Sequence, residues 1–150
     1  MKILVGFDGS ANATEALGWA VDEAAVRGCA VEVLSVLAVP ALAYGAPGYV
    51  PPTMDRFRSE MLPLVEHALE RTGRSLPGVP VELNVGEGSA AAILAERAKA
   101  PDVALVVVGA RGHGMITELM LGSASHALSH TCPKPLVIVP HNWSANRPAA

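Results

Sequence analysis

Short apolar runs alternate with helical segments along almost the whole chain, and this alternation constrains the fold most strongly. The runs are rich in Val, Ile and Leu, and turn-forming residues follow most of them. The expected strands are residues 3–7, 31–36, 79–85, 103–108 and 135–139. The expected helices are residues 11–27, 54–72, 90–99 and 124–130. Such alternation predicts a Rossmann-like α/β fold, an open five-stranded parallel sheet with helices on both faces.

The composition agrees with a single domain built around aliphatic side chains. Apolar residues make up 51% of the 150 residues and aromatic residues only 4%. Val, Leu, Ile and Ala must therefore form the core, which suits helices packed on buried parallel strands. We expect one domain over residues 1–140 and a C-terminal tail over 141–150, loose from Asn142 onward.

The charge pattern predicts neither a nucleic-acid nor a membrane partner. The net charge is −3 and the 11 Lys and Arg residues are scattered, whereas nucleic-acid-binding proteins concentrate positive charge. Asp8 interrupts the first apolar run, so the N-terminus lacks the form of a signal peptide, and no run approaches the ~18 apolar residues of a membrane span.

Cys29 and Cys132 are expected to be buried free thiols. We therefore expect a cytoplasmic protein.

Two unusual loops are expected to meet at one edge of the sheet. If the strand order is the common 3-2-1-4-5, the first and fourth strands are neighbours where the order reverses, and open α/β sheets bind ligands there. Asp8-Gly9-Ser10 follows the first strand, and a glycine segment that starts at Gly109 follows the fourth. The chain thus places its most unusual loops where this fold binds ligands.

The glycine segment has the properties of an anion cradle. Gly109 leaves the backbone bare after a buried strand, and Gly112 permits a positive φ that exposes backbone N–H groups. Gly122 and Ser123 stand at the expected start of a helix, whose free N–H groups attract phosphate. The alternative is that these glycines only make turns and that Ser123 only caps its helix.

Other residues allow more than one interpretation. Asp8 can accept a hydrogen bond within its own turn, contact a ligand, or hold Mg²⁺ through water and phosphate oxygens. His126 and His130 share a helix face, which is half of a zinc site, but no third ligand has a suitable spacing. Arg111 and His113 lie inside the glycine loop, where they face either a phosphate or solvent.

Three further segments bear on the shape of the domain. Ser10 and Ser89 are placed to cap the helices that follow them. Pro63 is expected to kink its helix or to start a new one. Residues 38–53 contain several Pro and Gly residues, and we expect a long excursion there.

The glycine segment resembles the nucleotide-binding motif of universal stress proteins, G-x2-G-x9-G-[ST]. The resemblance extends to the opening Ile3–Ser10, to Val85–Ala90, to Ser123–Ser125 and to the closing His130–Pro140. It covers about residues 1–140, with Ser89 in a place where the family usually has proline. It implies the ATP-binding branch of the family and a homodimer that pairs through the last strand, here Leu136–Val139.

The resemblance also implies roles for individual residues. Asp8 would meet the adenosine moiety, Val36 would line the adenine pocket, Gly109 and Gly112 would face ribose and phosphates, and residues 122–124 would hold the triphosphate of ATP, with Mg²⁺ or Mn²⁺. The residues expected to bind nucleotide are Gly6, Phe7, Asp8, Val36, Val108, Gly109, Arg111, Gly112, Gly122, Ser123, Ala124 and Ser125. No catalytic residue is expected, and Asp8 is the one candidate metal contact, through Mg-ATP.

The expected function is nucleotide-dependent regulation in a stress response, with at most slow ATP hydrolysis. No G-K-[ST] follows Gly112, so the lysine that clamps phosphates in P-loop enzymes is missing. One rival is an adenylating or hydrolysing enzyme of the related α/β group, although its S-G-G-x-D-S or H-x-G-H loop is absent. The other is a stress protein that binds cyclic AMP or no nucleotide. Binding is expected to order residues 40–53 and 110–121.

Overall fold

The computed structural model describes residues 1–38, 41–72, 78–112 and 121–145. It confirms the expected α/β fold, with a five-stranded sheet of order β3-β2-β1-β4-β5 in which every pairing is parallel. The strands are β1 Lys2–Gly6, β2 Ala30–Leu37, β3 Val81–Glu87, β4 Val103–Gly109 and β5 Leu136–Val139.

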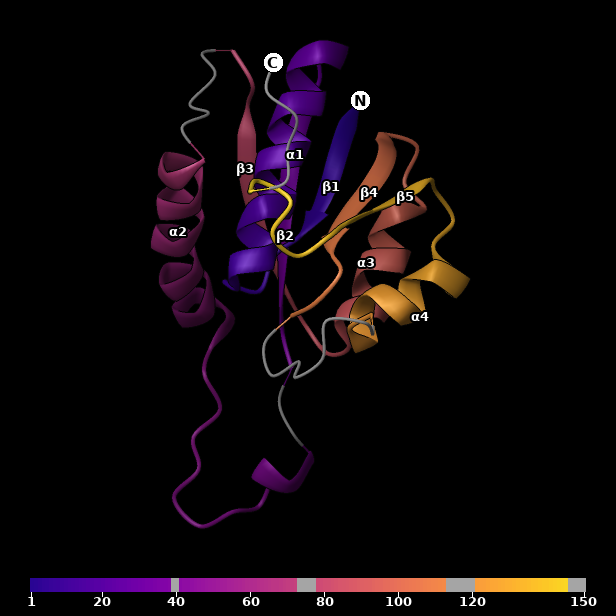
Figure 1. The fold of residues 1–150 in the computed structure, drawn as a ribbon. Helices are drawn as coiled ribbons and strands as arrows, with labels where there is room; N and C mark the ends of the chain where they lie inside the picture. Colours follow the sequence, from indigo (N-terminus) through magenta and orange to yellow (C-terminus); the bar gives the residue numbers. More distant parts are fainter. Residues whose placement is uncertain (39–40, 73–77, 113–120, 146–150) are drawn as a thin grey trace.

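Helices cover both faces of the sheet. They are α1 Ala11–Arg27, α2 Met54–Arg71, α3 Ala90–Ala98 and α4 Ser123–Thr131. A short 3₁₀ helix, η1 Ala41–Ala43, lies in the segment between β2 and α2 and covers neither face (Figure 1). Figure 1 shows α1 and α2 on one side of the strands and α3 and α4 on the other. Each face has its own aliphatic core, as the near absence of aromatic residues requires. Within the part of the chain that the structure describes, no helix is long and apolar enough to cross a membrane.

Helix α1 shows how the sequence sets an element and its burial. The Ser10 hydroxyl accepts from the amide of Ala13, and the helix ends at Gly28, whose φ of 65° is the left-handed conformation that glycine adopts without strain. Its apolar stripe is buried at Ala16, Leu17, Ala20, Val21 and Ala24. Asn12 lies in the same stripe although it is polar, and it is only 4% exposed.

Helix α2 continues through Pro63, so the expected restart at this proline is wrong. Pro63 is exposed, and the buried face persists on both sides of it at Met61, Val65 and Ala68. A proline inside a helix costs about 3 kcal/mol, because one backbone hydrogen bond is lost. Packing of this face against α1 and β3 offsets that cost.

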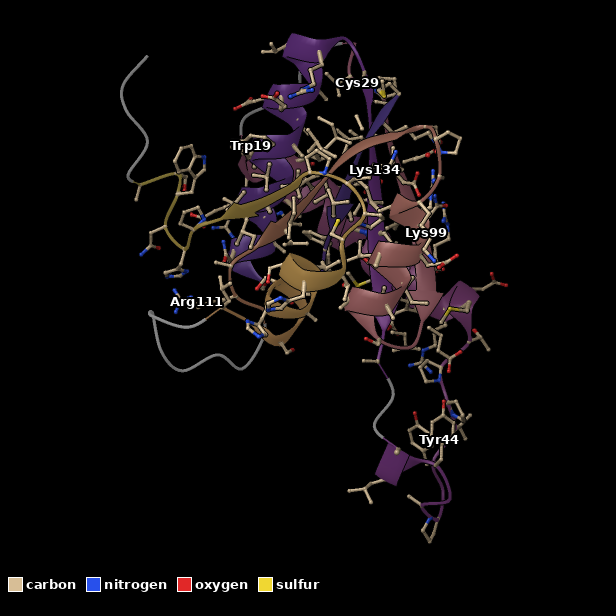
Figure 2. All side chains as sticks on the ribbon, turned by 90° about the vertical axis from the view of Figure 1, so that its right-hand side faces the viewer. Trp19, Cys29, Tyr44, Lys99, Arg111 and Lys134 are labelled. Atoms are coloured by element: carbon tan, nitrogen blue, oxygen red, sulfur yellow. The ribbon has the colours of Figure 1, made fainter. Side chains whose placement is uncertain are left out.

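The expected excursion covers residues 38–53, and residues 41–53 form most of its described part, because residues 39–40 lie outside the described chain. Figure 1 shows this segment projecting away from the sheet, and Figure 2 shows Tyr44 near its tip. The Tyr44 hydroxyl lies 3.1 Å from Oε1 of Glu87, at the end of β3, and the ring contacts Tyr49 edge to face. Leu42 and Val50 are exposed.

Two residues at the start of the C-terminal tail contact the rest of the domain. Trp143 is half-buried and packs against the core, and the Ser144 hydroxyl lies 3.0 Å from Oε1 of Glu15. The expectation of a loose tail did not include these contacts, which bury apolar surface of Trp143. Residues 146–150 lie outside the described chain.

A buried charge network joins the N-terminal ends of the strands, at the edge opposite the loops that follow β1 and β4. The Glu32 side chain is 1% exposed and accepts from Arg97 at 2.6 and 2.8 Å and from Asn84 at 3.2 Å. Arg97 also makes two 3.0 Å contacts with Asp102, and Lys2 lies 3.5 Å from Glu32. Each of these four charged residues, Lys2, Glu32, Arg97 and Asp102, therefore has a partner of opposite sign.

This pairing shifts the acid–base equilibria of the network. Burial alone would raise the pKa of Glu32, but hydrogen bonds from Arg97 and Asn84 outweigh it and hold that pKa below its usual value. Arg97 also lowers the pKa of Asp102. The two carboxylates raise the pKa of Arg97 in turn, Asp102 more than Glu32.

The two cysteines are free, as expected, but both are half-buried rather than fully buried. Cys29 follows the glycine that ends α1, and Cys132 follows the last residue of α4. Both residues therefore lie just beyond helix ends, where each packs against one of the two cores.

Candidate functional site

A hollow of about 260 Å³ opens at the C-terminal ends of β1 and β4. These strands are neighbours at the centre of the sheet, where the strand order reverses. The residues that line it are Gly6, Phe7, Asp8, Ala13, Leu34, Val36, Ala90, Leu94, Val108, Gly109, Arg111, Gly112, Gly122, Ser123, Ala124 and Ser125. All twelve residues expected to form a site from the sequence are among them.

One wall of the hollow is aliphatic. Val36 and Leu34 contribute from β2, Ala90 and Leu94 from α3, and Val108 from β4. Four lining residues, Leu34, Ala90 and Leu94 as well as Ala13 on α1, were not predicted from the sequence. The first three could have been inferred from spacing. Leu34 is two residues from Val36 on a strand and Ala90 is four residues from Leu94 on a helix, so each pair shares a face of its element. This wall suits the face of a flat, apolar ring.

The turn from β1 to α1 forms the next part of the rim. Gly9 has a φ of 83°, a conformation that favours glycine. Asp8 Oδ1 accepts from the Ser10 amide at 2.9 Å, as one interpretation of the sequence expected. The buried Ser35 hydroxyl donates to the Phe7 carbonyl at 2.7 Å and holds this turn against β2. The Asp8 carboxylate is exposed beside the hollow.

The N-terminus of α4 faces the hollow from the other side. Gly122 is the N-cap residue, and no side chain caps this helix. The interpretation of Ser123 as a cap is therefore wrong. Ser123 and Ala124 line the hollow in the first turn, where backbone N–H groups have no partner within a helix. The Ser125 hydroxyl is 3.0 Å from the carbonyls of Ala110 and Gly122, so it fastens the loop after β4 to the start of α4.

Gly109 is required by packing against the protein itself. A Cβ at this position would lie 2.9 Å from Cγ of Asn12 and 3.1 Å from its backbone. Real Cβ atoms rarely come this close to a backbone. The expectation that Gly109 is bare only for a ligand is therefore incomplete, because helix α1 already occupies the space that its side chain would need.

Glycine at position 112 also has a different structural reason from the one expected. Its φ is not positive, so the expected left-handed conformation is wrong. A Cβ on Gly112 would instead lie 2.7 Å from Oδ2 of Asp8. The two unusual loops therefore touch, and glycine lets the Asp8 carboxylate lie against the loop that follows β4.

The loop at residues 110–112 is held by hydrogen bonds at its first two residues. The Ala110 amide donates to the Val139 carbonyl at 2.9 Å, and the Ala110 carbonyl accepts from Gly122 at 2.7 Å. The Arg111 amide donates to Oδ1 of Asn12 at 2.9 Å. Asn12 was missed by the sequence analysis, although its place in the apolar stripe of α1 distinguished it.

Arg111 brings a cation to the lining of the hollow. Figure 2 shows it at the end of β4, at the other side of the molecule from Tyr44. Its Nη2 atom is buried and has no hydrogen-bond partner among the described residues. A guanidinium nitrogen in that position is a ready donor to an anion. His113, the other candidate in this loop, lies outside the described chain.

The structure adds no metal ligands to the histidine pair. The rings of His126 and His130 are 5.1 Å apart on α4, and both side chains are exposed. Within residues 1–38, 41–72, 78–112 and 121–145, no three His, Cys, Asp or Glu side chains are grouped to hold a metal ion. Among the described residues that line the hollow, Asp8 is the one carboxylate.

The sheet order, the helices on both faces and a hollow at the reversal of strand order define an open α/β domain of the doubly wound class. The model of the universal stress protein family matches residues 1–140. The chain belongs to this family. It is 30% identical over 146 residues to the universal stress protein YxiE of Bacillus subtilis, covering 92% of this chain and 97% of that protein.

Solved structures share the fold at lower identity. The protein MJ0577, 19% identical, superposes with a TM-score of 0.75 over 93% of this chain and 95% of its own. A universal stress protein from Archaeoglobus fulgidus, 20% identical, is described in complex with dAMP, with a TM-score of 0.62 over 92% and 96% of the two chains.

Two further structures of this fold are also described with nucleotides. A universal stress protein in complex with cAMP is 20% identical, with a TM-score of 0.67 over 93% and 96% of the two chains. An Arabidopsis thaliana family protein with AMP bound is 16% identical, with a TM-score of 0.58 over 99% and 97%. At these identities, the likenesses establish the fold alone.

Proposed function

We propose that this chain binds ATP in the hollow between β1 and β4 and acts as a nucleotide-dependent regulatory module in a stress response. Binding is accompanied by Mg²⁺ or Mn²⁺, hydrolysis is slow at most, and the protein works in the cytoplasm. The observation that carries this proposal is the division of the hollow into an aliphatic wall and a bare, amide-rich end.

The two ends of the hollow match the two ends of an adenine nucleotide. The aliphatic wall at Val36 and Leu94 suits a flat purine ring, and the N-terminus of α4 at Ser123 and Ala124 suits phosphate. The dAMP, cAMP and AMP in the structures described above have in common adenine, a sugar and phosphate. This shared chemistry supports an adenine nucleotide as the ligand class.

The neighbourhood of Asp8 supports a role at the ribose or the metal ion. Its carboxylate is exposed at the rim and lies against Gly112, on the path from the aliphatic wall to the start of α4. A carboxylate there can accept from ribose hydroxyls or hold a Mg²⁺ ion that also contacts phosphate oxygens. Arg111 adds a cation near the phosphate end.

The edge of the sheet supports a homodimer. Strand β5, Leu136–Val139, is the last in the sheet order, so one side of its backbone pairs with no other strand of the sheet. Three of its four residues are half-buried and apolar. Pairing with a second copy along this strand would cover a surface that otherwise favours aggregation.

A matched pair of variants at Gly122 tests the phosphate assignment. A Cβ there would meet the backbone of residues 110–112 at 3.4–3.5 Å, which is ordinary contact. Gly122→Ala should therefore retain ATP, whereas the two extra methyl groups of Gly122→Val should fill the space between the loop and α4 and abolish binding. The readout is equilibrium dialysis with labelled ATP, alongside thermal unfolding. ATP retention by a folded Gly122→Val variant would show that phosphate binds elsewhere.

A further inference from the structure

The end of β5, the loop after β4 and the start of α1 meet at one buried side chain. Asn12 is 4% exposed and lies outside the lining of the hollow. Its Oδ1 accepts from the Arg111 amide at 2.9 Å. Its Nδ2 lies 3.1 Å from the Val139 carbonyl and 3.3 Å from the Pro140 carbonyl. One amide group therefore joins two segments that are about a hundred residues or more away in sequence.

The backbone segments that contact Asn12, at the end of β4 and the end of β5, are also held against each other. The bare Cα of Gly109 packs against Asn12 so closely that a Cβ would collide with it. The Ala110 amide donates to the carbonyl of Val139, which Nδ2 of Asn12 also approaches. A movement of the loop at residues 110–112 therefore strains its contacts with the end of β5.

The segment that follows β5 rests on the same helix. Residues 141–145 return to α1, where Ser144 contacts Glu15 and Trp143 packs on the core. Glu15 is one turn along from Asn12 and lies 3.4 Å from its Nδ2. The tail and the loop that lines the hollow are thus fastened to one turn of one helix.

We propose that Asn12 is a positioning residue that holds the 110–112 loop and makes its position interdependent with that of the tail at residues 141–145. The part that concerns nucleotide rests on the proposed function. Nucleotide bound in the hollow fixes the position of the 110–112 loop. The hydrogen bonds of Asn12 then transmit this change in position to the end of β5 and to Trp143. Trp143 then reports on occupancy although it is absent from the lining of the hollow.

The first test needs no nucleotide. Hydrogen exchange is measured on the full chain and on Asn12→Ala, with Thr14→Ala as the matched control, since Thr14 lies in the same turn and its hydroxyl donates to the Ser10 carbonyl at 3.2 Å. Exchange of the Arg111 amide should be at least about tenfold faster in Asn12→Ala, the effect expected when one buried hydrogen bond is lost, and unchanged in Thr14→Ala. Equal exchange in the wild type and Asn12→Ala would overturn the proposal.

The second test follows Trp143 emission in a Trp19→Phe background, where Trp143 is the remaining tryptophan of the two in the chain. ATP should shift this emission with Asn12 present. The shift should be lost in Asn12→Ala at ATP concentrations that calorimetry shows to be saturating for that variant. Binding without any shift in the Asn12 protein, or an equal shift without Asn12, would overturn the coupling.

The two tests separate the two proposals. If calorimetry detects no nucleotide binding to the wild type while the Arg111 amide still depends on Asn12, the proposed function fails and the positioning role stands. If nucleotide binds and the Arg111 amide is indifferent to Asn12, the proposed function stands and the positioning role fails.

Discussion

At the scale of single residues, glycines in the site are explained by neighbouring protein atoms as much as by a ligand. Gly109 leaves room for Asn12, and Gly112 leaves room for the Asp8 carboxylate. The sequence motif predicted that these positions would be bare, but the spacing of glycines contains no information about a contact with residue 12. Tertiary packing between distant segments supplies that reason.

Gly109→Ala should therefore destabilise the fold itself. Its Cβ would lie 2.9–3.1 Å from Asn12, including backbone atoms that helix α1 holds in place. We expect a loss of about 1–3 kcal/mol in the free energy of unfolding, the usual effect of an overpacked core, measured by urea denaturation. Gly122→Ala is the control and should cost less than Gly109→Ala, because its Cβ would meet its neighbours at 3.4–3.5 Å. A Gly109→Ala variant as stable as the wild type would contradict the packing explanation.

At the scale of elements, the N-terminal edge of the sheet depends on helix α3 for charge balance. Glu32 lies near the start of β2, which pairs with β1 and β3, and Arg97 reaches it from α3. A glutamate within an apolar strand could have been identified from the sequence as a buried charge. Its partner, 65 residues later, could not, because the packing of α3 on the sheet brings the two together.

Removal of Arg97 should cost far more than removal of a surface charge. Arg97→Met would leave the Glu32 carboxylate buried without its main partner, and we expect a loss of about 3 kcal/mol in the free energy of unfolding. Lys99→Met, on the same helix but exposed, is the control and should change stability little. The double variant Glu32→Leu with Arg97→Met should recover most of the loss. Equal effects of Arg97→Met and Lys99→Met would refute the network.

The same network should make stability depend on acid. The pKa values of Glu32 and Asp102 lie below their usual values of 4.5 and 3.8, so the unfolded chain binds more protons than the folded one at low pH. Their contribution is complete above the usual values and is lost as pH falls through the folded pKa values. The urea concentration at the midpoint of unfolding of the wild type should therefore decrease as the pH is lowered below about 4.5. The difference in the free energy of unfolding between the wild type and Arg97→Met should become smaller at this low pH. A difference that does not change with pH would contradict this prediction.

At the scale of the whole molecule, the alternation of strands and helices sufficed to predict the parallel sheet and its two helical layers. The strand order followed from the commonest topology, and that order brought the two unusual loops together. The path of the tail could not be predicted in this way, because Trp143 packs on a surface that exists only after α1 and the sheet have assembled. The wall formed by Leu34 and Leu94 likewise depends on how β2 and α3 meet.

The proposal that the hollow is an adenine-nucleotide site is tested most directly by calorimetric titration of the purified wild-type chain with ATP in the presence of Mg²⁺, and with AMP and cyclic AMP in parallel. Our account predicts saturable binding of ATP with one site per chain. Absence of binding heat with all three nucleotides would contradict it.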